Sequence, residues 1–160
     1  MKTSVLMMVA GVAAMVAGTQ AWAADISGEV LAAHNALRAK HGVPALSWSP
    51  KLAASAQEWA NGCVFEHSST NNGENLAQGT SGAYSPAQFV NDWYGEISGY
   101  DFTSNTPSGD TGHFTQVVWK STKRVGCGIA SCSGDDLLVC QYSPAGNYDG
   151  EYLTNVPPPQ

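Results

Sequence analysis

Apolar residues recur at helical spacing in several stretches of the chain, and turn-forming residues separate these stretches. The first predicted helix is capped by Ser27 and runs to about His41, where Gly42 stops it. The second begins at the Ser-Pro pair of residues 49–50 and ends at Gly62. Each helix is predicted to bury one apolar face against the rest of the domain.

A third predicted helix begins at the Ser-Pro pair of residues 85–86. It carries Phe89, Trp93 and Glu96 on one face, so a carboxylate accompanies two large aromatic side chains. A carboxylate on a buried face needs a partner. Either it makes a structural hydrogen bond, or it belongs to a polar functional site.

Two β-like runs, residues 124–129 and 137–142, follow a short helical segment predicted at 114–119. The intervening residues 131–136 are rich in Ser, Gly and Asp, which is typical of a turn. The two runs are therefore predicted to pair as an antiparallel hairpin. The tail from Asn155 to Gln160 contains three successive prolines and is expected to be extended and exposed.

The N-terminus has the features of a secretory signal peptide. Lys2 provides a positive charge, residues 5–17 form an apolar run, and Ala-Trp-Ala at 21–23 is a small-x-small cleavage site. The expected organisation is a signal peptide at 1–23, one domain at 24–153 and a flexible proline-rich tail at 154–160. The alternative, a retained membrane anchor, is disfavoured because the apolar run is short for a bilayer span.

Cleavage would leave 137 residues, enough for one domain with its own core. It would also leave six Lys and Arg against 13 Asp and Glu, a formal net charge of −7. An acidic surface argues against nucleic acid binding and against electrostatic attraction to anionic lipid. The expected product is secreted, without stable membrane insertion, and extracellular or, in a microbe, held in the periplasm or cell wall.

The chain contains four cysteines, which are Cys63, Cys127, Cys132 and Cys140. An even number in an exported chain favours two disulfides over free thiols or a metal cluster. No Cys-x-x-Cys pair points to zinc or redox chemistry. The residues themselves leave three pairings open.

Three runs of sequence, at residues 112–120, 124–128 and 140–148, closely resemble the signature motifs of the CAP superfamily, the cysteine-rich secretory, antigen 5 and pathogenesis-related proteins. The first is Gly-His-Phe-Thr-Gln-Val-Val-Trp-Lys, and the similarity begins at His-Asn-x-x-Arg, residues 34–38. The resemblance implies an α+β fold, a three-layer α-β-α sandwich with a small central antiparallel sheet and an open cleft. It also favours pairing of Cys63 with Cys127 and of Cys132 with Cys140. It does not name a reaction, because members of this family act in different ways.

In the family, two histidines and two glutamates line the cleft, and the matching residues here are His67, Glu74, Glu96 and His113. Neutral imidazoles are good zinc ligands, and nearby carboxylates can ligate, orient or accept a proton from bound water. The resemblance therefore implies a weakly held Zn²⁺ or other divalent cation, with a purely structural hydrogen-bonded cluster as the alternative. Spacing alone does not predict a metal site, because His67 and His113 are 46 residues apart and no His-Glu-x-x-His pattern is present.

The loop after the third predicted helix contains Tyr100 and Phe102. Fungal members have a very similar Trp-Tyr-x-Glu-Ile-x-x-Tyr-Asp-Phe run, here residues 93–102, and this neighbourhood is linked to sterol binding in them. In the same fungal members, fatty acids are bound in a separate groove between helices. The resemblance thus implies a lipid-binding loop at Tyr100 and Phe102, and the alternative is ordinary packing of both rings onto the domain.

Three functional hypotheses follow. The favoured one is a non-enzymatic binder of sterols or related small lipids. The second is a zinc-dependent hydrolase or protease in which His67 and His113 hold the metal and Glu74 or Glu96 acts as general base. The third is a host-directed effector or antimicrobial protein that acts through an unidentified protein partner.

Overall fold

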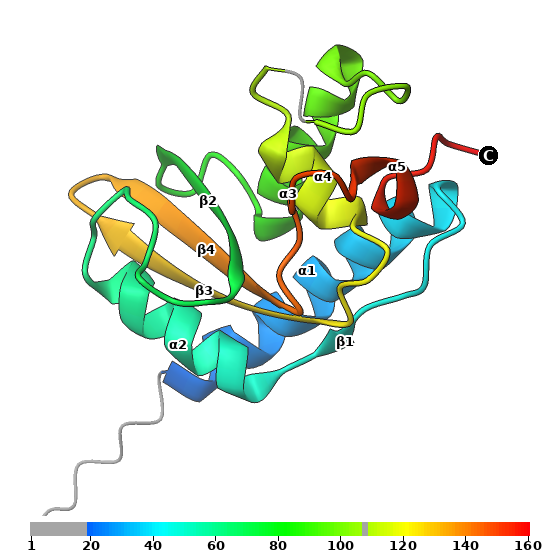
Figure 1. Cartoon of the computed structure of the whole chain (residues 1–160). Coiled ribbons are helices and arrows are strands. Elements are labelled where there is room, and N and C mark those ends of the chain that lie inside the picture. Colours follow the sequence, from blue (N-terminus) through cyan, green and yellow to red (C-terminus); the bar gives the residue numbers. More distant parts are fainter. Residues whose placement is uncertain (1–18, 107–108) are drawn as a thin grey trace, which may run out of the picture.

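The structure, a computed structural model, describes residues 19–106 and 109–160 (Figure 1). Most of the predicted signal peptide, residues 1–23, lies outside the described residues. Helix α1 spans Thr19–Lys40, so the prediction that Ser27 caps it is wrong. Alanine-rich sequence precedes Ser27 and favours helix, which lets α1 continue through that position. The helix ends where predicted, and Gly42 after it adopts a left-handed φ of +63°.

The remaining elements follow in one order along the chain. They are β1 (Ser47–Trp48), α2 (Pro50–Asn61), β2 (Gly73–Thr80), α3 (Pro86–Gly95), the 3-10 helix η1 (Glu96–Gly99), α4 (Gly112–Val118), β3 (Arg124–Cys132), β4 (Asp135–Ser143) and α5 (Tyr152–Asn155). Ser49 and Ser85 cap α2 and α3 through their side chains, as predicted. None of the described helices combines the length and hydropathy that crossing a bilayer requires.

The four strands form one sheet in the order β1-β3-β4-β2. The predicted hairpin is present as β3 and β4, which pair antiparallel along their whole length. Strand β2 pairs antiparallel with the other edge of β4, and the two residues of β1 pair parallel to β3. Strand β2 was not predicted, although it carries one of the residues of the expected cleft, Glu74.

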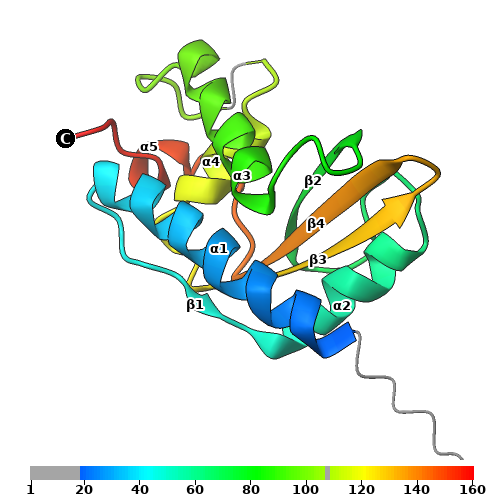
Figure 2. The same ribbon diagram turned by 180° about the vertical axis from the view of Figure 1, so that it is seen from behind.

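The sheet lies between two helical layers, which confirms the predicted sandwich (Figures 1 and 2). Successive side chains of β4 point to opposite faces, as in any strand. Leu137 and Val139 pack with the buried alanines of α2, whereas Leu138, Cys140 and Tyr142 join the larger core beneath α1, α3 and α4. The larger core holds most of the aromatic residues, and the polar cleft is built at its margin.

Helix α2 lies directly on β3 because two glycines of that strand face it. A Cβ atom on Gly126 would lie 2.2 Å from the backbone nitrogen of Ala53, and one on Gly128 would lie 2.3 Å from Cα of Gln57. Only a residue without a Cβ allows this approach. The side chain of Gln57 then bonds the backbone of Ile129 in both directions, at 2.8 and 3.1 Å.

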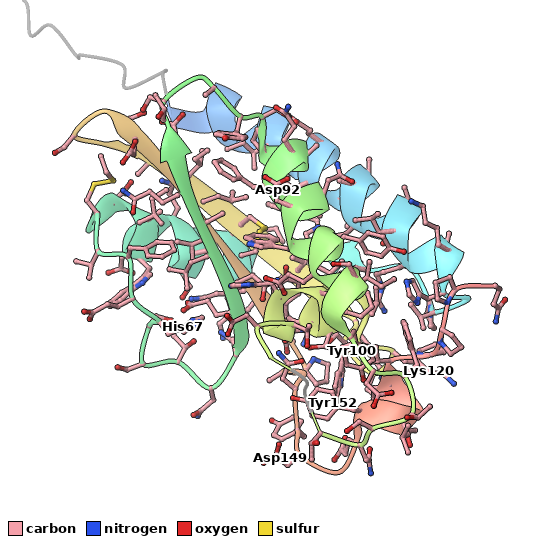
Figure 3. The ribbon with its side chains drawn as sticks, turned by 90° about the horizontal axis from the view of Figure 1, so that it is seen from above. His67, Asp92, Tyr100, Lys120, Asp149 and Tyr152 are labelled. Carbon is pink, nitrogen blue, oxygen red and sulfur yellow. A yellow bond between two sulfur atoms is a disulfide. The ribbon has the colours of Figure 1, made fainter. Side chains whose placement is uncertain are left out.

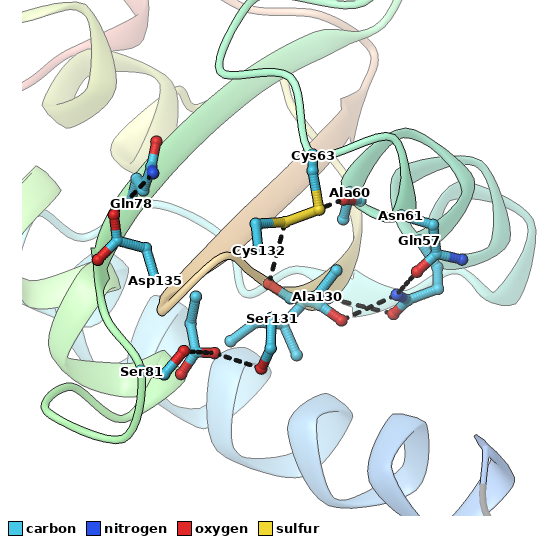
Figure 4. The surroundings of a disulfide bond; sticks show 12 residues. Gln57, Ala60, Asn61, Cys63, Gln78, Ser81, Ala130, Ser131, Cys132 and Asp135 are labelled. Atoms are coloured by element: carbon cyan, nitrogen blue, oxygen red, sulfur yellow. Dashed lines mark hydrogen bonds between the residues drawn. A yellow bond between two sulfur atoms is a disulfide. The ribbon is translucent and has the colours of Figure 1, made fainter.

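The disulfide pairing that the family resemblance favoured is wrong. The structure joins Cys63 to Cys132 and Cys127 to Cys140. Cys127 and Cys140 are direct partners in the β3–β4 register, with Cα atoms 4.1 Å apart. Cys132 lies at the far end of β3, where it meets the segment that follows α2, and there it bonds Cys63 (Figure 4). The hairpin register therefore decides the pairing.

An exposed tail was predicted from Asn155 onward, and this is wrong for the first residues of that segment. Asn155 ends α5, and both Asn155 and Val156 are buried. The carbonyl of Pro157 lies 2.6 Å from Nδ1 of His41, and the N–H of Gln160 donates to the carbonyl of Lys40 at 2.9 Å. The C-terminal segment therefore packs along the end of α1.

Candidate functional site

Glu96 lies where α3 passes into η1, and it orients His113. Its Oε1 is 2.7 Å from Nδ1 of His113, and its Oε2 accepts hydrogen bonds from the backbone N–H groups of His113 and Phe114 at 3.0 and 3.1 Å. These N–H groups open α4 and have no acceptor within their own helix. The imidazole also stacks on the indole of Trp93, with ring centroids 6.1 Å apart. Glu96 thus has the structural partner predicted for it, and it also belongs to the polar site.

Glu74 in β2 holds the second histidine in the same manner. Its side chain is 5 % exposed, and its Oε1 lies 3.1 Å from Nδ1 of His67. The same carboxylate accepts hydrogen bonds from the N–H of Ser68 at 2.8 Å, from the Ser68 hydroxyl, and from Nε2 of Gln141 at 3.1 Å. Such a set of donors is what a buried carboxylate requires. Neither Ser68 nor Gln141 was predicted as part of the site.

The two histidine–glutamate pairs meet at one cavity of about 390 Å³, which His67, Glu74 and His113 line. Because Nδ1 of each imidazole faces a glutamate, Nε2 is the nitrogen left for a ligand. A carboxylate behind the distal nitrogen is the usual support for a metal-binding histidine. Among the described residues, however, no three His, Cys, Asp or Glu side chains gather closely enough to hold an ion. The site therefore resembles a pair of oriented imidazoles more than a closed structural zinc site.

A buried hydrogen-bond chain behind the cavity was missing from the sequence-based prediction. Nδ1 of His34 donates to the carbonyl of Val30 at 2.8 Å, which leaves Nε2 to accept from the hydroxyl of Tyr142, also at 2.8 Å. Nδ2 of Asn75 reaches both that hydroxyl, at 3.3 Å, and the carbonyl of His113, at 3.1 Å. Burial lowers the pKa of His34 to about 4, so the imidazole is neutral at physiological pH.

The loop expected to bind lipid packs against the core. Tyr100 is 8 % exposed, and its ring meets those of Phe102 and Phe114 edge-on, with centroids 4.9 and 5.3 Å apart. Phe102 is half-buried and lies 6.4 Å from the imidazole of His41. Packing onto the domain, the alternative prediction, therefore accounts for the position of Tyr100.

The hydroxyl of Tyr100 is nevertheless unusual. It is a buried oxygen without a hydrogen-bond partner among the described residues. Burial is also the main cause that raises the pKa of this phenol, which keeps it protonated and able to donate. Figure 3 shows Tyr100 near Tyr152, a residue that also lines the cavity shared by His67 and His113. The aromatic cluster therefore adjoins the cavity of the histidine pair.

Hydrogen bonds fasten the loop over this aromatic cluster to the C-terminal segment. The Nδ2 of Asn105 donates to the carbonyl of Gly150 at 2.6 Å, and its Oδ1 accepts from the N–H of Leu153 at 3.0 Å. The N–H of Gly150 also donates to the carbonyl of Asn105 at 3.2 Å. Asn105 is thus the residue that holds the loop down.

Comparison with known proteins shows which family has this architecture. The family model described as CAP, the cysteine-rich secretory protein family, matches residues 31–142. Repressed by EFG1 protein 1 of Candida albicans is 45% identical over 139 residues, covering 82% of this chain and 50% of that protein. Protein PRY2 of Saccharomyces cerevisiae is 43% identical over 141 residues, covering 84% and 42%. The chain thus spans about half the length of these two fungal relatives.

A plant relative matches over most of its own length. Pathogenesis-related protein 1A of Nicotiana tabacum is 42% identical over 130 residues, which cover 77% of each chain. Similarity that extends over most of a whole plant protein, and over about half of larger fungal ones, is what one shared domain produces.

Solved structures share the fold at lower sequence identity. Schistosoma mansoni venom allergen-like protein 4 has a TM-score of 0.67 and 24% identity, covering 81% of this chain and 97% of its own. NaASP2 with Zn²⁺ has a TM-score of 0.66 and 24% identity, covering 85% and 86%. Structures with this fold therefore include one with a divalent metal.

The family model matches residues 31–142, which is more than half of the chain, and the two fungal relatives are above 40% identity. The chain belongs to the cysteine-rich secretory protein family, the CAP superfamily.

Proposed function

We propose that this protein is a secreted, non-enzymatic binder of sterols or related small lipids. The observation that carries the proposal is the Tyr100 hydroxyl, which is buried in an aromatic cluster without a hydrogen-bond partner among the described residues. Leaving a buried hydroxyl unpaired costs about 1–3 kcal/mol. A sterol offers the complementary chemistry, because it combines a large apolar body with a single hydroxyl.

The similarity to fungal relatives supports the same assignment. The run at residues 93–102 resembles the segment linked to sterol binding in fungal members of the family, and fungal proteins match this chain at 43–45% identity. Secretion rests on the predicted signal peptide at residues 1–23 and on two disulfides, which persist in oxidising compartments.

A ligand reaches Tyr100 only if the loop at residues 101–106 moves. The half-buried ring of Phe102 would then line the entrance, and the exposed side chain of Leu153, at 52 %, would extend the apolar rim. The hydrogen bonds of Asn105 would open together, because all of them join this loop to the segment around Gly150. We therefore expect slow association of the lipid, because the loop must open first. We also expect an affinity that is insensitive to ionic strength, because the contacts are apolar.

Saturation binding of a fluorescent sterol to the purified, oxidised protein tests the proposal, with a chelator present to silence metal chemistry. We expect saturable binding that weakens about tenfold in Phe102→Ala, because an apolar ring at the site is lost. Tyr148→Ala removes an aromatic ring that is 53 % exposed elsewhere and should change the affinity less than twofold. Absence of saturable binding by the folded protein would contradict the proposal.

We also propose that Nε2 of His67 and of His113 binds a divalent cation weakly. The two imidazoles share one cavity, and each is oriented by a glutamate through Nδ1. Zinc titration by calorimetry should give weak binding that disappears in His67→Ala/His113→Ala, and the double variant should bind sterol as the parent does. A zinc-dependent hydrolase is the less favoured function, because both candidate bases, Glu74 and Glu96, already accept hydrogen bonds from the protein that would compete with a reacting water.

A further inference from the structure

Strand β2 leaves one side of its backbone open. It is the last strand in the sheet order, so only its other side pairs with β4. Backbone groups of successive residues in a strand point to opposite sides. The carbonyl of Leu76 accepts a hydrogen bond from Nε1 of Trp93 at 3.1 Å, so Leu76 points away from β4. Gln78, two residues further on, must turn its N–H and C=O the same way.

The disulfide at the centre of the sheet gives the same register independently. The Cα atoms of Cys127 and Cys140 are 4.1 Å apart, the spacing of a pair that exchanges no backbone hydrogen bonds. The backbone groups of Cys140 therefore point to β2, where its partner is Asn75. This places Asn75 on the paired side and Gln78, three residues later, on the open side.

A groove of about 530 Å³ runs along this open edge. Aromatic side chains stand on both of its walls, with Tyr84 on the α3 side and Phe65, from the segment after α2, on the other. Tyr84 is 45 % exposed and Phe65 is 57 % exposed, which is high for large apolar rings. An added strand would send alternate side chains toward these two walls.

The groove is also acidic. The described residues that line it include the carboxylates of Asp92, Glu96 and Asp135 and no Lys or Arg side chain. Glu96 is engaged with His113, but Asp92 is exposed on α3, and Asp135 accepts a hydrogen bond from a neutral amide, Nε2 of Gln78, at 3.0 Å. A basic partner would therefore be attracted, whereas a second copy of this acidic chain would be repelled.

We propose that the groove binds an extended, positively charged peptide segment of a partner protein, which adds to β2 as a further strand. The backbone of Gln78 would supply the strand hydrogen bonds, and Asp92 and Asp135 would face lysine or arginine side chains. Apolar side chains of the segment would contact Phe65 and Tyr84. This site is distinct from the lipid site proposed around Tyr100, and neither proposal depends on the other.

The test uses a dye-labelled octapeptide, Lys-Lys-Val-Val repeated twice and capped at both ends, so that lysine and valine side chains face both walls. Its binding to the full-length protein is measured by fluorescence anisotropy. We expect saturable binding that weakens as salt is raised. The corresponding glutamate–valine peptide should not bind. A lysine–valine peptide with N-methylated backbone amides should bind at least tenfold more weakly, because it cannot pair with the strand edge.

Matched variants locate the site. Gln78→Pro removes the open-side N–H at a position where an edge strand tolerates proline, and it should weaken binding at least tenfold relative to Gln78→Ala. Asp92→Asn should weaken it about threefold, and Asp149→Asn, whose side chain Figure 3 places far from Asp92, should have no effect.

Three results would overturn the inference. These are equal binding by folded Gln78→Pro and Gln78→Ala, equal binding of the N-methylated peptide, and equal binding of the acidic peptide. The two peptide comparisons decide the matter even if Gln78→Pro fails to fold. Dimerisation of the protein that Gln78→Pro abolishes would assign the edge to a second copy of the chain instead.

Discussion

Arg38 is a buried cation that donates hydrogen bonds to four backbone carbonyls, which have left water on folding. Its guanidinium donates to the carbonyls of Pro44, Val117, Trp119 and Thr122 at 2.8–3.2 Å. Burial lowers its pKa to about 10, which still leaves it charged at neutral pH. The five donors of a guanidinium suit this task, and no other side chain offers them in one plane. Arg38 thus fixes α1 to the turn between α4 and β3.

Replacing this cation should be costly. Arg38→Met leaves several buried carbonyls unpaired and is expected to lower the free energy of unfolding by about 3–5 kcal/mol. Urea denaturation at pH 7 measures the change. Lys51→Met, which removes an exposed cation, should stay within about 0.5 kcal/mol of the parent. Similar losses in both variants would contradict the structural role of Arg38.

His34 gives the fold a dependence on pH. Its pKa is about 4 in the folded protein and 6.5 when unperturbed, so the unfolded chain takes up a proton first as the pH falls. Its contribution is complete above pH 6.5 and is lost progressively toward pH 4. The free energy of unfolding should drop by about 2–3 kcal/mol between pH 7.5 and 4.5 from this residue.

Denaturation curves at several pH values test this expectation. His34→Gln should be less stable at pH 7.5 but should lose less stability on acidification. An unchanged slope in His34→Gln would show that the acid sensitivity arises elsewhere.

Single residues were predictable from the sequence to different degrees. The four cleft residues followed from the family resemblance, because spacing does not reveal that His67 and His113 approach one cavity. Ser68, Asn75 and Gln141 were missed, since polar residues acquire such roles only when tertiary structure surrounds them.

Among the elements, the contact between α2 and β3 depends on the absence of side chains. Gly128→Ala would place a methyl group against the backbone of α2, so helix or strand must shift. We expect destabilisation of about 1–3 kcal/mol by thermal or urea unfolding. Gly28→Ala, with no atom within 4 Å of the added methyl group, should be neutral or stabilising. An equally mild effect of Gly128→Ala would argue against such close packing.

The sequence predicted the elements with strong periodicity or caps and missed those that depend on pairing. Helices α2 and α3 have Ser-Pro starts, and the β3–β4 hairpin has alternating residues around a turn. Strand β2, Gly-Glu-Asn-Leu-Ala-Gln-Gly-Thr, has few strand-forming residues and is a strand because β4 offers a partner. The disulfide pairing failed for the same reason, since the register of β3 against β4 was unknown.

At the scale of the whole molecule, the C-terminal segment completes the domain instead of trailing from it. Its buried residues Asn155 and Val156 close the core, and Pro157 and Gln160 bond the end of α1. Proline content predicted an exposed tail because composition carries no information about long-range partners. The same segment holds the loop above Tyr100 through Gly150 and Leu153. The lipid entry that we propose would therefore be coupled to the C-terminal segment.

The pairing of a lipid hydroxyl with Tyr100 is the central claim, and a double-difference binding measurement tests it most directly. Affinities would be measured for a sterol and for the analogue that lacks its 3-hydroxyl oxygen, with the parent protein and with Tyr100→Phe, which keeps the ring. We predict that the parent prefers the free sterol by about tenfold and that Tyr100→Phe loses this preference while remaining folded. An equal preference in both proteins, or no sterol binding by the parent, would contradict the account.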